Sequence, residues 1–243
     1  MRKVCAKMVP RLLNDDQKER RLQVCQDIIE RLQTEPDLLR RVITGDETCF
    51  FFWSATRKPS ARDVSGSLTS PRPKKARQSK SKVKVMFITF FDVRGIVHGE
   101  FLPQGQTINQ QVYKEILRLL LRSVREKRRE LWQDKSWLLH HDSAPAHNAL
   151  NIRQLLAEKN MAVLEQPPYS PDLAPCDFFL FPAKLKGIIK GARFEGVEVE
   201  RVVTTELRGI PKESFQQCIE AWQRRMEKCI KPVLNWANVS SRT

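Results

Sequence analysis

Two apolar runs separated by a short polar turn constrain the fold of this chain more than any other feature. The first run, residues 83–91, is rich in β-branched and aromatic side chains, which is typical of a β-strand. After a turn at residues 92–95, the second run continues over residues 96–102. A connection of about four residues is normal between antiparallel neighbours, so the sequence predicts a β-hairpin. Any fold for this chain must therefore contain a β-sheet.

Helical and strand-like patterns alternate on both sides of this hairpin. Before it, we expect a helix over residues 15–33 with Asp15 or Asp16 as its N-cap, followed by a strand. After it, the expected elements are a helix over residues 107–131, a strand over 137–142, a helix over 148–160, a strand over 162–164 and two amphipathic helices at about 195–208 and 212–230. This order predicts a mixed α/β fold with a central sheet flanked by helices.

Residues 54–82 differ in composition from the rest of the chain. Ser, Pro, Arg and Lys dominate there and apolar periodicity is lost, so we predict a long basic insertion loop. Basic residues occur without an intervening acid in its second half and just after it, namely Arg72, Lys74, Lys75, Arg77, Lys80, Lys82 and Lys84. We expect these residues to bind DNA phosphates. A merely solvated linker, or a nuclear import signal, is the alternative interpretation of the same residues.

The charge balance of the whole chain indicates a polyanionic partner. Forty-three Lys and Arg residues oppose 28 Asp and Glu residues, which gives a formal net charge of +15. Such a surplus most often neutralises phosphate, although solvated surface charge explains it too. No apolar run approaches the ~18 residues that span a bilayer, and no basic amphipathic helix has the apolar face of a membrane anchor. We therefore expect a nucleic acid and not a membrane as the partner.

The cysteines give no sign of a metal site or a disulfide scaffold. They form no CxxC pair and are too sparse for a disulfide-rich domain. The six residues are Cys5, Cys25, Cys49, Cys176, Cys218 and Cys229. The amino terminus is too broken by charge for a secretory signal. We expect an intracellular protein whose thiols are reduced and mostly structural.

Three aspartates stand at the ends of predicted elements. Asp46 and Asp142 each end an apolar strand-like run, and Asp177 begins a helix just after Pro175. Asp177 follows Asp142 by 35 positions (177 − 142), so 34 residues lie between the two carboxylates. Carboxylates delivered from separate elements can hold hard divalent cations against phosphate, and magnesium needs only a few such ligands. Spacing alone would allow many other sets among the 28 acidic residues.

Histidines near the second aspartate allow a different kind of site. The three histidines within residues 140–147 could bind zinc, but strand alternation places His140 and His141 on opposite faces. No cysteine stands at ligand spacing from them, so we favour a packed or supporting role for these side chains. A serine hydrolase is not favoured either, because the chain has no Gly-x-Ser-x-Gly motif.

Two longer motifs make the chain resemble the mariner-type transposases. They are HHDSAPAH at residues 140–147 and PPYSPDLAPCD at residues 167–177, and the gap between their aspartates fits that family. The resemblance covers roughly residues 1–230 and implies a ribonuclease-H-like fold with cut-and-paste chemistry on DNA ends. It also implies two Mg²⁺ or Mn²⁺ ions per site. By this resemblance, Asp46, Asp142 and Asp177 would be the metal-binding catalytic triad.

The chain also departs from the pattern of that family. Mariner transposases carry two helix-turn-helix units ahead of the catalytic domain, whereas this chain begins at what resembles the interdomain linker. Met8 stands where the family usually has Trp, Ser143 replaces the usual Asn, and Cys49 replaces an aromatic residue. From these departures we expect that recognition of specific DNA ends is lost. We also expect a homodimer to be weakened, because the family's linker supports dimerisation.

The expected organisation is a linker remnant at residues 1–14, a ribonuclease-H-like catalytic domain at 15–232 and a C-terminal tail at 233–243. We predict a nuclear, transposase-derived protein that binds DNA with little sequence preference. It would retain a three-aspartate, two-metal site for phosphodiester cleavage and strand transfer, without transposing on its own. Two alternatives stay open: a catalytically silent DNA-binding or chromatin-associated protein, and an expressed relic of marginal stability without a selected role.

Overall fold

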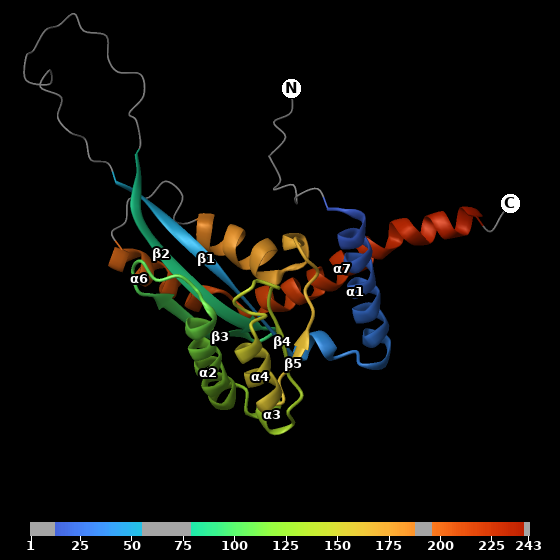
Figure 1. Cartoon of the computed structure of the whole chain (residues 1–243), viewed down its shortest axis with the longest axis horizontal. Coiled ribbons are helices and arrows are strands. Elements are labelled where there is room, and N and C mark those ends of the chain that lie inside the picture. Colours follow the sequence, from blue (N-terminus) through green and yellow to red (C-terminus); the bar gives the residue numbers. More distant parts are fainter. Residues whose placement is uncertain (1–12, 55–78, 188–195, 241–243) are drawn as a thin grey trace, which may run out of the picture.

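A five-stranded mixed β-sheet forms the centre of the protein (Figure 1). The computed structural model describes residues 13–54, 79–187 and 196–240. The strands follow one another across the sheet in the order β3-β2-β1-β4-β5. Their bounds are β1 Val42–Ser54, β2 Ser79–Asp92, β3 Gly95–Leu102, β4 Leu138–His140 and β5 Ala162–Leu164.

The predicted hairpin is the antiparallel pair β2 and β3. On the other side of β2, β1 continues the antiparallel ladder. The two short strands run parallel, β4 to β1 and β5 to β4. Parallel neighbours need a crossover connection, which α4 (Leu150–Glu158) supplies between β4 and β5. The expected mixed α/β sheet flanked by helices is confirmed.

Helices cover both faces of this sheet (Figure 1). On one face, α2 (Gln110–Lys127) and α4 pack against Phe90 of β2. On the other face, the π-helical segment η3 (Cys176–Lys186) and α6 (Gly196–Gly209) pack against Phe91. Neighbouring residues of a strand point to opposite faces, so β2 needs apolar side chains at consecutive positions to build both layers.

The long helix α7 (Lys212–Ser240) begins against the sheet, where Phe215 packs on Phe91, and runs out past α1 (Asp15–Thr34), which it contacts (Figure 1). Ile28 of α1 and Trp222 of α7 belong to one buried apolar cluster, which continues into β1 and β4. The last residue of α7 is Ser240, so this helix continues into the segment 233–243 that was predicted as a tail. No helix in the described ranges is long and apolar enough to cross a bilayer.

The N-cap predicted for the first helix was wrong. Asn14 caps α1, because its side chain accepts a hydrogen bond from the backbone N–H of Gln17 at 2.8 Å. The side chain of Gln17 in turn accepts from the backbone N–H of Asn14, which completes a capping box. Asp15 and Asp16 lie in the first turn instead, where acids suit the positive end of the helix dipole.

The single helix predicted over residues 107–131 is two helices. α2 begins after the cap residue Asn109 and ends before Arg128, and α3 (Arg129–Gln133) follows. Arg128 leaves the helical conformation at the break, and its guanidinium bonds the buried carboxylate of Asp92. The break is thus tied to a tertiary contact that helical periodicity does not contain. Three short elements complete the fold: η1 Leu38–Arg41, α3 and η2 Pro171–Leu173.

Both strands beside the predicted basic loop are longer than expected. β1 does not end at Asp46 but continues to Ser54, and β2 begins at Ser79, because the two strands pair along most of this length. The end of the predicted loop therefore belongs to a strand. Residues 55–78, the remainder of that loop, and residues 1–12 of the predicted linker lie outside the described residues.

Candidate active site

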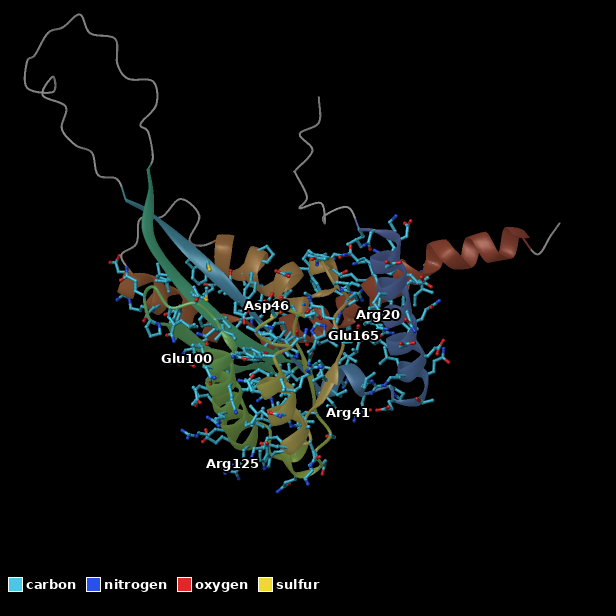
Figure 2. All side chains as sticks on the ribbon, viewed as in Figure 1. Arg20, Arg41, Asp46, Glu100, Arg125 and Glu165 are labelled. Carbon is cyan, nitrogen blue, oxygen red and sulfur yellow. The ribbon has the colours of Figure 1, made fainter. Side chains whose placement is uncertain are left out.

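The three predicted aspartates line a single cleft of ≈ 370 Å³. Asp46 comes from the middle of β1, Asp142 follows β4, and Asp177 lies in the first turn of η3. Figure 2 shows Asp46 near the centre of the molecule. The rest of the wall comes from two connecting segments and consists of Ser143, Ala144, Pro145, Gln166, Pro167, Pro168, Tyr169, Ser170 and Pro171.

Pairing of parallel strands brings the first two carboxylates together. β1 and β4 pair with Thr44 opposite His140, so Asp46 and Asp142 each follow two residues later from the same edge. Gly45 allows β1 to lie close to its other neighbour, since a Cβ at this position would be 2.1 Å from the Phe90 ring. The position of Asp46 thus depends on a glycine just before it.

Asp46 carries a carboxylate whose charge is poorly compensated. Its Oδ1 accepts a hydrogen bond from the backbone N–H of Glu47 at 2.7 Å. Burial, with repulsion from Asp177, Glu47 and Asp142, nevertheless raises the pKa of Asp46 well above its usual value. Negative charge at this point is therefore costly in the protein alone, and any cation in the cleft would relieve that cost.

Asp142 is held in a different way. Its Oδ1 accepts a backbone hydrogen bond from Ala144 at 3.0 Å and lies 2.6 Å from Nδ1 of His147. Burial acts to raise the pKa of Asp142, but hydrogen bonds and the charge of His147 offset it, so that the pKa is lowered. This carboxylate is ionised and oriented.

His147 bridges two acids of the site. It is 2% exposed, and its Nε2 lies 3.0 Å from Oε1 of Glu47 while Nδ1 contacts Asp142. Burial would lower the pKa of His147, but hydrogen bonds to Asp142 and Glu47 raise it to about 10. The imidazole is therefore positively charged at neutral pH and donates to one carboxylate from each nitrogen.

The other two histidines of the cluster are neutral and packed. Burial lowers the pKa of His140 to about 3 and that of His141 to about 4. Nδ1 of His140 lies 2.9 Å from the hydroxyl of Thr44, and Nδ1 of His141 lies 2.7 Å from the hydroxyl of Tyr113. Tyr113 also stacks on the ring of His147, with 3.9 Å between centroids. These contacts build the wall behind Asp142.

Carboxylates that share the cleft do not converge on one point. Among the residues that the structure describes, no three His, Cys, Asp or Glu side chains are gathered closely enough to hold one ion. This applies to the histidines weighed as zinc ligands and to the three aspartates alike. The donor chemistry of the cleft is nevertheless that of a magnesium or manganese site, because the acids offer only hard oxygen ligands.

Two residues of this site were missed from the sequence. Glu47 follows Asp46 directly and was quoted only as part of a motif, while Tyr113 was not singled out. Their contacts with His147 span 100 and 34 positions (147 − 47 and 147 − 113), so no local pattern signals them. The adjacency of two acids at the centre of a strand was the one available hint for Glu47.

The predicted DNA-binding residues fall either in β2 or outside the described residues. Lys80, Lys82 and Lys84 lie in β2, where a loop was expected for the first two. Arg72, Lys74, Lys75 and Arg77 fall outside the described residues.

Comparison with known proteins places the chain among transposases. A family described as "Transposase (partial DDE domain)" matches residues 66–134. The Mariner Mos1 transposase of Drosophila mauritiana is 34% identical over 224 residues, which cover 91% of this chain and 63% of that protein. The histone-lysine N-methyltransferase SETMAR of Homo sapiens is 29% identical over 225 residues, or 90% of this chain and 32% of that protein. The chain thus spans less than two thirds of the length of either relative.

Solved structures agree with these matches. The catalytic domain of Mos1 mariner transposase superposes with a TM-score of 0.76 at 29% identity, over 92% of this chain and 97% of that chain. A pre-cleavage Mos1 transpososome matches with a TM-score of 0.82 at 31% identity, over 96% of this chain and 66% of that chain. The chain therefore carries a ribonuclease-H-like DDE transposase domain. Within that class the domain is of the mariner type.

Proposed function

We propose that this chain cleaves DNA phosphodiester bonds with the help of divalent metal ions held by Asp46, Asp142 and Asp177. The observation that carries the proposal is the meeting of these three side chains in one cleft, delivered by β1, the end of β4 and η3. Solved Mos1 structures contain Mn or Mg, which supports the same ions here. Two such ions, when bound, would supply the Lewis acid for an in-line displacement at phosphorus.

The residues around the triad control the charge and the orientation of its carboxylates. Asp142 stays ionised because His147 and the backbone of Ala144 donate to it, so it is ready to act as a ligand without losing a proton. Asp46 has a raised pKa and would lose its proton as positive charge enters the cleft. Glu47 keeps His147 charged and in place from the opposite side. Together these contacts would fix the orientation of Asp142, whereas the protonation of Asp46 would change when a cation enters the cleft.

DNA is the proposed substrate. Its phosphates suit a chain of net charge +15, and the Mos1 structures include a paired-end complex with a left transposon end. We further propose a nuclear location and a weakened homodimer. The basic residues 72–84 would contact the DNA backbone with little sequence preference.

The proposal includes the division of the chain into a linker remnant at residues 1–14, a catalytic domain at 15–232 and a tail at 233–243. That the chain does not transpose on its own stays a prediction, which an excision assay in cells would test.

The decisive experiment compares wild type with Asp142→Asn. Purified wild-type protein should nick supercoiled DNA in the presence of Mn²⁺ or Mg²⁺, and the variant should not. Asp16→Asn is a matched control, because Asp16 is an exposed acid in the first turn of α1, remote from the cleft. Equal nicking by wild type and Asp142→Asn would show that the activity belongs to a contaminant, and the proposed function would be abandoned.

A catalytically silent DNA-binding protein is the second candidate, and the charge surplus of the chain favours it independently of the cleft. It predicts steep dependence of affinity on salt. Neutralising Lys74, Lys75, Arg77 and Lys80 together should reduce that dependence. A control variant would neutralise four exposed basic residues elsewhere, namely Arg153, Lys159, Arg201 and Lys212. If both quadruple variants gave the wild-type salt slope, the basic segment would have no part in the interface.

A further inference from the structure

Two cysteines lie in contact between α1 and α7, outside the aspartate cleft. Cys25 of α1 is 0% exposed and Cys229 of α7 is half-buried. Cys229 packs against the buried cluster that contains Cys25, and the two thiols interact electrostatically. Both side chains belong to the apolar cluster that joins the two helices, which cross in Figure 1. The two sulfur atoms are therefore neighbours although 204 positions (229 − 25) separate them in the chain.

Arg21 brings a positive charge to this pair. Its Nη2 donates to Sγ of Cys229 at 3.1 Å, and its two terminal nitrogens bond the carboxylate of Asp172 at 2.8 Å and 2.5 Å. The neighbouring thiol of Cys25, together with Arg21, outweighs burial and the charge of Asp172, so that the pKa of Cys229 is lowered. The shifts favour the thiolate on Cys229 and the protonated thiol on Cys25, whose pKa is raised.

Cys229 lines a groove between α1 and α7. The groove has a volume of ≈ 550 Å³, and its walls are formed by Leu13, Lys18, Glu19, Arg21, Leu22, Lys228 and Cys229. The other buried thiols differ in both access and charge. Burial raises the pKa of Cys218 to about 12 and that of Cys176 well above its usual value. Cys229 alone among the three combines thiolate character with an open approach.

We propose that Cys229 and Cys25 form a peroxide-reactive thiol pair, with Cys229 as the attacking thiolate and Cys25 as the resolving thiol. The sulfur of Cys229 attacks an oxygen of a small hydroperoxide. The O–O bond breaks, an S–OH group forms, and the departing hydroxide or alkoxide takes up a proton. The sulfur of Cys25 then gives up its proton and attacks the sulfur of Cys229, so that an S–S bond forms and water leaves. The two thiols are thereby oxidised by two electrons to one disulfide. Hydrogen peroxide is reduced to two molecules of water, and an organic hydroperoxide is reduced to one molecule of water and one of alcohol.

The disulfide would link α1 to α7, which are in contact in the fold but stand near opposite ends of the sequence. A cross-link between residues far apart in sequence removes much conformational freedom from the unfolded chain. Oxidation should therefore raise the midpoint of thermal unfolding. The pair is independent of the aspartate triad, so this proposal stands or falls separately from DNA cleavage.

The first test uses the wild-type chain. After treatment with equimolar hydrogen peroxide at neutral pH, non-reducing peptide mapping should find one cross-linked product that joins the peptides of Cys25 and Cys229. Cys49, which is partly exposed, serves as the internal reference and should stay unmodified at this dose. A map with Cys229 unmodified, or with the first oxidation product on another cysteine, would overturn the proposal without any need for a variant.

Variants then separate the two roles. In Cys25→Ser, the S–OH group on Cys229 has no partner and should be trapped by dimedone, whereas the buried-thiol control Cys218→Ser should still form the cross-link. Arg21→Gln should slow alkylation of Cys229 by iodoacetamide at pH 7 about fivefold, since it removes the charge that favours the thiolate. The groups that face Cys229 are Arg21 and Cys25 from α1 and Asp172 from η2. An unchanged alkylation rate in folded Arg21→Gln would contradict the assignment.

Discussion

Two aspartates of the same sheet, the buried Asp92 and the half-buried Asp46, differ in how their charges are compensated. Asp92, at the end of β2, is 0% exposed, and its oxygens accept bonds from Arg128 at 2.6 Å and 2.9 Å. The backbone N–H of Arg94 donates to it as well, at 2.8 Å. Asp46, in the middle of β1, receives one backbone bond and faces other acids. Arg128 and Arg94 make Asp92 a structural residue.

The contrast separates a compensated charge from an uncompensated one. A buried carboxylate with its own guanidinium contributes to the fold, since breaking such a pair leaves an uncompensated charge. The half-buried carboxylate of Asp46, beside Asp177, Glu47 and Asp142, is strained in the protein alone. Strain of this kind gathers at functional sites, because the missing charge is supplied by a ligand or metal. The two aspartates therefore make opposite predictions when each is neutralised.

Asp46→Asn should have the largest effect on activity. We expect DNA nicking to fall at least about a thousandfold, since a ligand of the proposed metals is removed. The thermal midpoint without metal should not fall, because the substitution removes a charge that its neighbours repel. Nicking assays and thermal denaturation of the same preparations measure both. The comparison fails if the variant unfolds at lower temperature than Asp16→Asn, the exposed control.

Asp92→Asn should have the largest effect on stability. The change leaves Arg128 without its carboxylate in a largely buried position, which costs about 3–5 kcal/mol in comparable pairs. The free energy of unfolding in urea gives this value directly. Residual nicking per folded molecule should be close to wild type. A stability loss under about 1 kcal/mol would show that the pair is not compensated in the way described.

Gly45→Ala tests the backbone beside the strained aspartate. The new methyl group would meet the Phe90 ring at 2.1 Å, so β1 and β2 must move apart at an expected cost of about 1–3 kcal/mol. Gly209→Ala is the matched control, because no atom lies within 4 Å of the added Cβ. Urea denaturation of both variants measures the difference. Equal stabilities would mean that the Phe90 ring moves aside freely and that Gly45 is not needed there.

His147→Gln should have the smallest effect of the four. Glutamine can still donate to one acid but carries no charge, so Asp142 would be less firmly held. Loss of a residue that supports a ligand typically weakens metal affinity or activity about tenfold or more. Calorimetric titration with Mn²⁺ separates this from a folding defect. An unchanged affinity, with Asp142→Asn abolishing binding, would restrict His147 to packing against Tyr113.

Local pattern accounts for most of the elements of this protein. The runs of β-branched and aromatic residues in β2 and β3, and the inward Ile152, Leu155 and Leu156 of α4, are local patterns that predict their elements. The sequence also contains the signal for Asn14 as the N-cap, since its capping partner Gln17 stands three residues later. The prediction nevertheless named the adjacent acids Asp15 and Asp16. The motifs around the three aspartates indicated the family, and with it the ribonuclease-H-like fold.

Contacts between distant residues lie beyond any such pattern. The break at Arg128 depends on Asp92, 36 positions earlier, and the charge of His147 depends on Glu47, 100 positions earlier. The low pKa of Cys229 likewise depends on a helix at the other end of the chain. Residue type and spacing determine which segments form helices and strands, because those preferences act over a few residues. Burial and charge compensation are properties of the packed domain, so only three-dimensional packing distinguishes the satisfied Asp92 from the strained Asp46.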